Sequence, residues 1–364
     1  MREAESLARL RLARSEGVGP GTFRRLLARH GGAAAALDGL AAERLVAADP
    51  DRTRREHDAV TTRGGSWLHL GGPGYPPLLA LAEDAPPVLA VLGDPALLLG
   101  RGVAVVGARN ASAAGLRIAE ELAEGLSAAC VTIHSGLARG VDAAAHRGGL
   151  TGPGRTVGVL AGGLDVAYPP ENRSLQERIA AEGALVAENP LGTAPLARHF
   201  PKRNRIVAGL SLGVAVVEAA LRSGTLITSR FGNELGREIY AVPGSPLDPR
   251  CQGSNDLLRQ GAHLCERASD VLETLPASPH ALPLFRPRRT APPAPAAGFR
   301  AAAAEPPDPG PDLLDLIGPT PVPVDEVLRR CHLPAPSARA LLSELELEGR
   351  IQTLPGNRVV RLPA

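Results

Sequence analysis

The middle of the chain, from residue 101 to about 275, alternates between short apolar runs and longer segments with helical periodicity. Short, mostly apolar runs predict strands at 102–106, 130–133, 156–160, 184–187, 214–217 and 238–242. Such runs are typical of strands buried on both faces. Helical segments such as 113–128 and 141–150 separate them. The alternation predicts an α/β fold, with a mostly parallel, Rossmann-like sheet between layers of helices.

The pattern changes before this middle part. Residues 1–65 have apolar positions at helical spacing and predict a small helical domain. Within it, Gly17-Val18-Gly19 resembles a helix-hairpin-helix turn, although a plain interhelical turn explains these residues better. Residues 66–100 are rich in Gly and Pro and predict a loop-rich lead-in, so that the second domain extends over 66–275.

The pattern changes again after the middle part. Residues 276–311 are rich in Pro and Ala and predict a linker that does not fold. Residues 312–364 predict a winged helix-turn-helix, which consists of three helices and a hairpin. The helices are expected at 313–317, 324–330 and 337–347, and the hairpin at 350–362.

The third helix of this winged helix is acidic. It carries Glu344, Glu346 and Glu348 against the single Arg339, and Ser337 is its expected N-cap. Acidic side chains repel DNA phosphates, so contact with protein is favoured over contact with DNA, which remains the alternative.

Composition limits the class of protein without deciding its function. The 364 residues suit two or three domains, and an apolar fraction of 44% suffices for a globular core. A net charge of +2 does not by itself indicate a nucleic-acid partner. Four cysteines without CxxC spacing are typical of free thiols in a reducing compartment. Without a signal peptide or a long apolar run, we expect a cytoplasmic protein with no membrane partner.

Positive charge is concentrated in one short segment. No Asp or Glu lies between Glu188 and Glu218, whereas four cations lie within eight positions: Arg198, Lys202, Arg203 and Arg205. Lys202 is the only lysine of the chain. The segment predicts a cationic loop that leads into a helix over 203–210. A solvated loop without a ligand is the alternative.

Glycine-rich loops with arginine or hydroxyl side chains follow four predicted strands. They are 107–112, 135–142, 161–165 and 222–225. The carboxyl ends of parallel strands form one edge of a sheet, where doubly wound folds bind their ligands. Backbone N–H groups at a helix start such as Thr225 favour a phosphate, so the loops predict an anion site. Neither G-x-G-x-x-G nor a P-loop occurs, so neither a dinucleotide site nor a Walker-type ATPase is indicated.

The candidate site residues lie in these loops and in the cationic segment. They are Arg109, Ser112, Gly136, Arg139, Gly140, Phe200, Lys202, Arg203, Asn204, Arg205, Arg222, Ser223, Gly224 and Thr225. We expect the side chains of five of them to form one phosphate-contacting surface: Arg109, Arg139, Lys202, Arg203 and Arg205. Of these, Arg205 is the one best suited to a structural role. Phe200 offers a face for base stacking or else is a core aromatic.

The order of these motifs resembles the DprA/Smf family of bacterial DNA-processing proteins. The matching segments are 105–109 with Ser112, 135–142, 162–165 with Tyr168-Pro169 and Asn172, 200–206, 222–228 and 241–244. Ala108 stands where the family often has Ser, and Val141 where Ile is usual. The resemblance implies an extended Rossmann-like domain that binds single-stranded DNA without cleaving it. It also implies a homodimer and loading of the RecA recombinase onto DNA covered by single-strand-binding protein.

Two other functions fit parts of the pattern. The fold resembles that of phosphoribohydrolases that activate cytokinins, whose motif is Gly-Gly-x-Gly-Thr-x-x-Glu, but Thr228 stands where the catalytic glutamate belongs. Glu218 and Asp142 are the carboxylates able to replace it, although hydrogen bonds to loop backbone or an arginine partner suit them better. A transcription factor acting through the winged helix is the other alternative.

We expect no metal, no cofactor and no enzymatic activity. His134 and His146 lack partners at metal-ligand spacing and are better explained as core or helix-face histidines.

Overall fold

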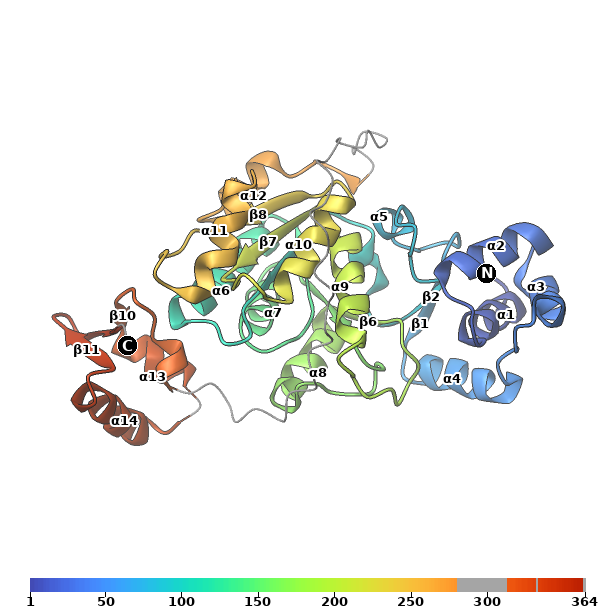
Figure 1. Cartoon of the computed structure of the whole chain (residues 1–364). Helices are drawn as coiled ribbons and strands as arrows, with labels where there is room; N and C mark the ends of the chain where they lie inside the picture. The colour runs from blue at the N-terminus through green and yellow to red at the C-terminus, as the bar shows by residue number, and fades with distance from the viewer. Residues whose placement is uncertain (280–312, 332, 363–364) are drawn as a thin grey trace.

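The computed structural model describes residues 1–279, 313–331 and 333–362. Figure 1 shows helices of the N-terminal part at one end, a central α/β domain, and a small C-terminal domain at the opposite end. The predicted linker, 276–311, lies outside the described residues from position 280 onward. In the described part of the chain, no helix is both long and apolar enough to cross a membrane.

Four α-helices and one 3-10 helix form the N-terminal part, as the sequence predicts. They are α1 (Glu3–Arg14), α2 (Pro20–His30), α3 (Ala33–Gly39), η1 (Leu40–Glu43) and α4 (Pro50–Thr62). Phe23, Leu26 and Leu40 are buried in an apolar cluster formed by the N-terminal part alone. Pro20 occupies the first turn of α2, where its fixed φ angle suits a helix start.

One nine-stranded sheet forms the centre of the molecule, in the order β1-β2-β6-β5-β4-β3-β7-β8-β9. From β6 to β9 in this order, all neighbouring strands are parallel. These strands are β3 (Gly102–Gly107), β4 (Thr132–Ser135), β5 (Thr156–Leu160), β6 (Ala184–Ala187), β7 (Gly213–Val217), β8 (Glu238–Ala241) and β9 (His263–Leu264). β3, β5 and β7 are buried along their whole length. The prediction of a mostly parallel, buried sheet is confirmed.

The segment 66–100 was wrongly predicted as a loop-rich lead-in. It contains β1 (Ser66–His69) and β2 (Val88–Gly93), which form an antiparallel pair next to β6. The Gly and Pro residues that suggested a loop lie between these strands, around the short helix α5 (Pro77–Ala80). The apolar run of β2 was the signal of a strand, and the turn residues on either side of it concealed that signal.

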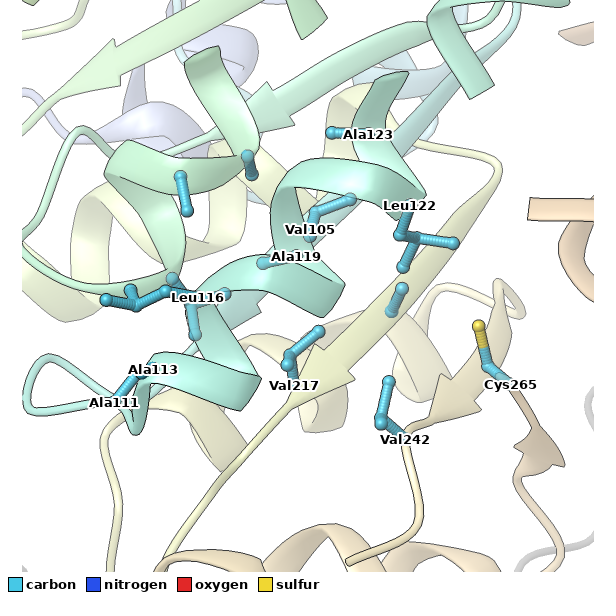
Figure 2. Close-up of a cluster of buried hydrophobic side chains, with 14 of the residues drawn as sticks. Val105, Ala111, Ala113, Leu116, Ala119, Leu122, Ala123, Val217, Val242 and Cys265 are labelled. Atoms are coloured by element: carbon cyan, nitrogen blue, oxygen red, sulfur yellow. The ribbon is translucent and has the colours of Figure 1, made fainter. Parts of the chain in front are cut away.

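Helices cover both faces of the sheet. On one face lie α6 (Ala113–Ala128) and α7 (Val141–Gly149), and Figure 2 shows Leu116, Ala119 and Ala123 of α6 with Val105 and Val217 of the strands. On the other face, α9 (His199–Leu210) packs against β3 and β7 in a second apolar cluster. The remaining helices are α8 (Arg173–Glu182), α10 (Thr225–Glu234), α11 (Gln252–Arg259) and α12 (Ala268–Thr274).

The C-terminal domain is a winged helix, as predicted. Its elements are the 3-10 helix η6 (Leu313–Leu316), β10 (Val322–Pro323), α13 (Val324–Arg330), α14 (Ala335–Leu347), β11 (Ile351–Leu354) and β12 (Arg358–Arg361). The expected N-cap was wrong: α14 begins at Ala335 after Pro334, two residues before Ser337, and has no side-chain cap. An ion pair of 3.2 Å between Arg330 Nη1 and Glu120 Oε2 connects this domain to α6.

Candidate nucleic-acid interface

Three loops at the carboxyl edge of the sheet are joined by hydrogen bonds. The loop after β4 reaches the loop after β3, where the Val141 N–H donates to the Ala108 carbonyl at 3.2 Å. The Thr225 hydroxyl, at the start of α10, donates to the carbonyl of Gly107 at 2.8 Å. The loops after β3, β4 and β7 therefore form one connected surface, as the sequence predicts for strand ends at one edge.

Gly140 is needed for this contact. Its φ angle of +72° favours glycine, and a Cβ atom there would lie 2.3 Å from the carbonyl oxygens of both Ala108 and Arg109. The preceding Leu137 is also left-handed, with φ of +57°, and its N–H donates to His146 Nε2 at 3.2 Å. The loop after β4 is thus fixed by a buried histidine, and His146 is a core residue.

An arginine and two aromatic side chains meet at this edge. The Arg109 guanidinium lies 5.2 Å from the ring centroid of Phe200, a distance typical of a cation–π contact. Tyr168, in the loop between β5 and η3 (Pro170–Asn172), lies beside Phe200, with ring centroids 5.8 Å apart. Arg109 is exposed, Tyr168 is 45% exposed and Phe200 is half-buried. Phe200 therefore lies at the surface and does not belong to the apolar core. We call these three residues the Phe200 cluster.

The cationic segment is a helix and not the loop that the sequence predicted. α9 already begins at His199, and its charges divide into two groups. Lys202 and the preceding Arg198 are exposed, whereas Arg203 and Arg205 are buried. Of these four cations, only Arg198 and Lys202 are accessible to a ligand.

Arg203 was wrongly predicted to contact phosphates at the surface. It is only 6% exposed, and its Nη1 lies 3.8 Å from Oδ2 of Asp142. The carboxylate also accepts the N–H of Gly136 at 3.1 Å. A Cβ atom at Gly136 would lie 1.0 Å from Arg203 Nη1, so the absence of a side chain there makes room for the guanidinium. Burial raises the pKa of Asp142, against the effect of Arg203, and burial lowers the pKa of Arg203.

Arg205 supports the fold on the far side of α9. Its Nη2 lies 2.7 Å from both carboxylate oxygens of Glu188, at the end of β6. It also hydrogen-bonds the carbonyl of Asp84. This buried arginine joins α9 to two neighbouring segments.

Arg139 and Ser112 have partners within the chain. Arg139 forms an ion pair with Glu171, in the 3-10 helix η3 (Pro170–Asn172). Ser112 is 5% exposed and caps α6, where its hydroxyl accepts the Gly115 N–H at 2.9 Å. The same hydroxyl donates to Glu218, so Ser112 is a capping residue with no free group for a ligand.

The turn before α10 combines exposed backbone with internally bonded hydroxyls. Arg222 and Gly224 are exposed. The Ser223 hydroxyl accepts the Thr225 N–H at 3.1 Å and shapes the turn. Asn204 of α9 donates to the Gly224 carbonyl at 3.4 Å, which connects the turn to the helix that carries Lys202.

The carboxylates considered for hydrolysis are bonded to backbone. Glu218 Oε2 accepts the Ser112 N–H at 2.8 Å, and Asp142 accepts two N–H groups of its own loop. Thr228, at the position of the catalytic glutamate in the phosphoribohydrolase motif, is buried in α10. Among the residues described, no three His, Cys, Asp or Glu side chains form a group that could hold a metal ion.

We expect Arg203→Ala to lower the free energy of unfolding by about 3–5 kcal/mol, because Asp142 would stay buried without its cationic partner. Lys202→Ala, one position earlier on the exposed face of α9, is the matched control and should change it by less than about 0.5 kcal/mol. Urea denaturation of both variants measures the difference. Equal effects would contradict the assignment of Arg203 to the interior.

Comparison with protein families gives one match for each part of the chain. The family described as DNA recombination-mediator protein A matches residues 66–276, more than half of the chain. The DprA-like N-terminal HHH domain matches residues 3–59, and the DprA winged helix domain matches residues 292–357.

Individual relatives agree with these matches. Protein Smf of Escherichia coli is 41% identical over 292 residues, which cover 78% of this chain and 74% of that protein. DNA processing protein DprA of Bacillus subtilis is 41% identical over 60% of this chain and 74% of its own length.

Two solved structures share the fold. The X-ray structure of DprA from Streptococcus pneumoniae has a TM-score of 0.65 at 32% identity and covers 76% of this chain and 99% of its own. DprA from Helicobacter pylori, whose structure is reported for its single-stranded DNA binding mode, has a TM-score of 0.53 at 28% identity. It covers 58% of this chain and 95% of its own. With three matched domains in the order of the fold and these relatives, the chain belongs to the DprA/Smf family of DNA-processing proteins.

Proposed function

We propose that the carboxyl edge of the sheet binds single-stranded DNA. The observation that carries the proposal is the Phe200 cluster, in which an exposed arginine lies over a half-buried aromatic ring with Tyr168 beside it. Lys202, two residues after Phe200 on α9, adds an exposed cation. Cations beside aromatic faces are the combination with which proteins hold phosphates and stack unpaired bases.

The arrangement favours a single strand over a duplex. Stacking on Phe200 or Tyr168 requires a free base face, and the bases of a duplex are already stacked on one another. Phosphate contacts by Arg109 and Lys202 do not distinguish sequences, so we expect binding without sequence preference. The single-stranded DNA binding mode reported for the H. pylori relative supports this reading.

The candidate residues divide into contacts and supports. We propose Arg109, Phe200, Lys202, Arg222 and Tyr168 as contacts, together with Arg198 from the start of α9. Arg139 is a further proposed contact, which would exchange its partner Glu171 for a phosphate. Gly224 lets a DNA strand approach the backbone of an exposed turn. The other candidates position these groups: Ser112, Gly136, Gly140, Arg203, Asn204, Arg205, Ser223 and Thr225.

Family membership extends the proposal to recombination. We propose that the chain acts in the cytoplasm as a homodimer and helps RecA assemble on DNA covered by single-strand-binding protein. The family description, DNA recombination-mediator protein A, supports this role. The chain should shorten the lag before RecA hydrolyses ATP on such DNA, without itself hydrolysing ATP or nucleoside monophosphates. An unchanged lag would contradict the mediator role, and turnover by the chain alone would favour the nucleotide-processing alternative.

We expect Arg109→Glu to weaken binding to poly-dT and to a mixed sequence alike, because a phosphate contact carries no base information. The plot of log K against log salt should become less steep by about 0.7, the value for one neutralised single-strand phosphate. Arg54→Glu, an exposed arginine of α4, is the matched control and should leave both quantities unchanged. If folded Arg109→Glu keeps the wild-type affinity and slope, Arg109 is not a phosphate contact.

We expect Phe200→Ala to reduce the free energy of single-strand binding by about 1–3 kcal/mol, the range for one base stacked on an aromatic ring. The salt slope should stay the same, because no charge is removed. Phe200→Tyr keeps the ring and should retain most of the affinity. Fluorescence anisotropy with labelled oligonucleotides at several salt concentrations separates the two variants, and equal losses in both would argue against stacking.

A further inference from the structure

The sheet order reverses next to β3, since β4 lies on one side of it and β7 on the other. In doubly wound folds, ligands bind in the crevice outside the strand ends at such a reversal, and a phosphate lies at the N-terminus of the following helix. In this chain the corresponding position is bounded by the end of β3, the start of α6 and the residue that follows β7. Figure 2 shows Ala113 at the start of α6, Ala111 in the loop just before it, and Val217 on β7.

A carboxylate of the chain itself occupies this position. Glu218 Oε2 accepts the Ser112 N–H at 2.8 Å, and Oε1 accepts the Ser112 hydroxyl. A Cβ atom on Gly115, in the first turn of α6, would lie 2.5–2.8 Å from the carboxyl atoms of Glu218. The carboxylate therefore lies against the first turn of α6, where a bound phosphate would otherwise lie.

The backbone at Glu218 is unusual for this residue type. Its φ angle is +50°, a left-handed conformation that non-glycine residues rarely adopt, and the residue is only 8% exposed. A buried carboxylate is unfavourable unless hydrogen bonds compensate the lost hydration. Both features indicate that the surrounding contacts hold Glu218 in place, as is typical of functional sites.

The carboxylate fixes one end of the loop that carries Arg109. The Ala108 N–H donates to the Val217 carbonyl at 3.4 Å at the other end, and Arg109 and Asn110 are exposed between the two attachments. We infer that Glu218 is an internal anion that closes the crevice to nucleotides and positions Arg109 over Phe200. The second half of this inference rests on the proposed single-strand binding.

The direction in which DNA affinity changes when Glu218 is removed distinguishes a positioning role from a purely electrostatic effect. A glutamate near a DNA site repels phosphates, so its removal should strengthen binding if charge alone matters. If Glu218 positions the loop, its removal should weaken binding although a negative charge has been lost. A small carboxylate from solution that fills the vacated position should then restore affinity.

The test compares Glu218→Ala with the wild type in potassium acetate and in potassium chloride at equal ionic strength. In chloride we expect Glu218→Ala to bind single-stranded DNA about tenfold more weakly, the effect of losing one charged hydrogen-bond contact. In acetate the ratio of the two affinities should approach one, and acetate should raise the melting temperature of the variant more than that of the wild type. Unchanged or stronger binding by Glu218→Ala, or an affinity ratio that acetate does not change, would overturn the positioning role.

Glu326→Ala is the matched control, because Glu326 is a buried glutamate of the winged helix with arginine partners. It should lose stability while keeping single-strand affinity, whereas equal losses of affinity in both variants would reduce the role of Glu218 to general stability and overturn the inference. If Glu218→Ala does not fold, Glu218→Gln keeps the size without the charge and should shift affinity in the same direction. The melting-temperature response to acetate tests the internal anion even if the wild type binds no DNA. Failure of the proposed DNA binding can therefore be distinguished from failure of the inference about Glu218.

Discussion

The candidate interface depends on the close approach of two loops, one after β3 and one after β4. Gly140 permits it, because any side chain there would overlap the carbonyl oxygens of Ala108 and Arg109. The hydrogen bond from Val141 to Ala108 then joins the start of α7 to the loop that carries Arg109. Without this contact, neighbouring strands would present separate loops. With it, Arg109 is fixed within reach of a ring on a third segment.

Burial divides the cations of α9 between structure and surface. Arg198 and Lys202 are four residues apart, lie on one side of the helix and stay exposed. Arg203 fills the space left by Gly136 and pairs with Asp142, and Arg205 pairs with Glu188. A buried arginine needs such partners because its desolvation is unfavourable. The buried arginines of α9 therefore stabilise the neighbouring loops, while its exposed cations lie at the surface.

Much of the fold could be predicted from local patterns, whereas the division of roles within the site could not. Continuous apolar runs indicated the parallel strands, because strands buried on both faces need no polar positions. β1 and β2 were not predicted, because the Gly and Pro residues between them are typical of loops. Glycines and arginines after the strands indicated that these loops meet at one edge of the sheet, and the hydrogen bonds between the loops agree with that. The burial of Arg203 depends on Gly136 and Asp142, which are more than 60 positions away, and charge counts contain no such information.

The sequence places Tyr168 in a family motif but does not mark it as a site residue, since its exposure and its contact with Phe200 appear only in three dimensions.

Lys202 also gives the molecule a chemical property that its arginine-rich composition makes unusual. It is the single lysine of the 364 residues, and it is exposed on α9, two positions after Phe200. Apart from the N-terminal amine, it is therefore the one primary amine that an acylating reagent can modify. Reductive methylation or a fluorescent ester would modify only α9 and the N-terminal amine, so that the native sequence carries its own reporter group on the helix that also carries Phe200.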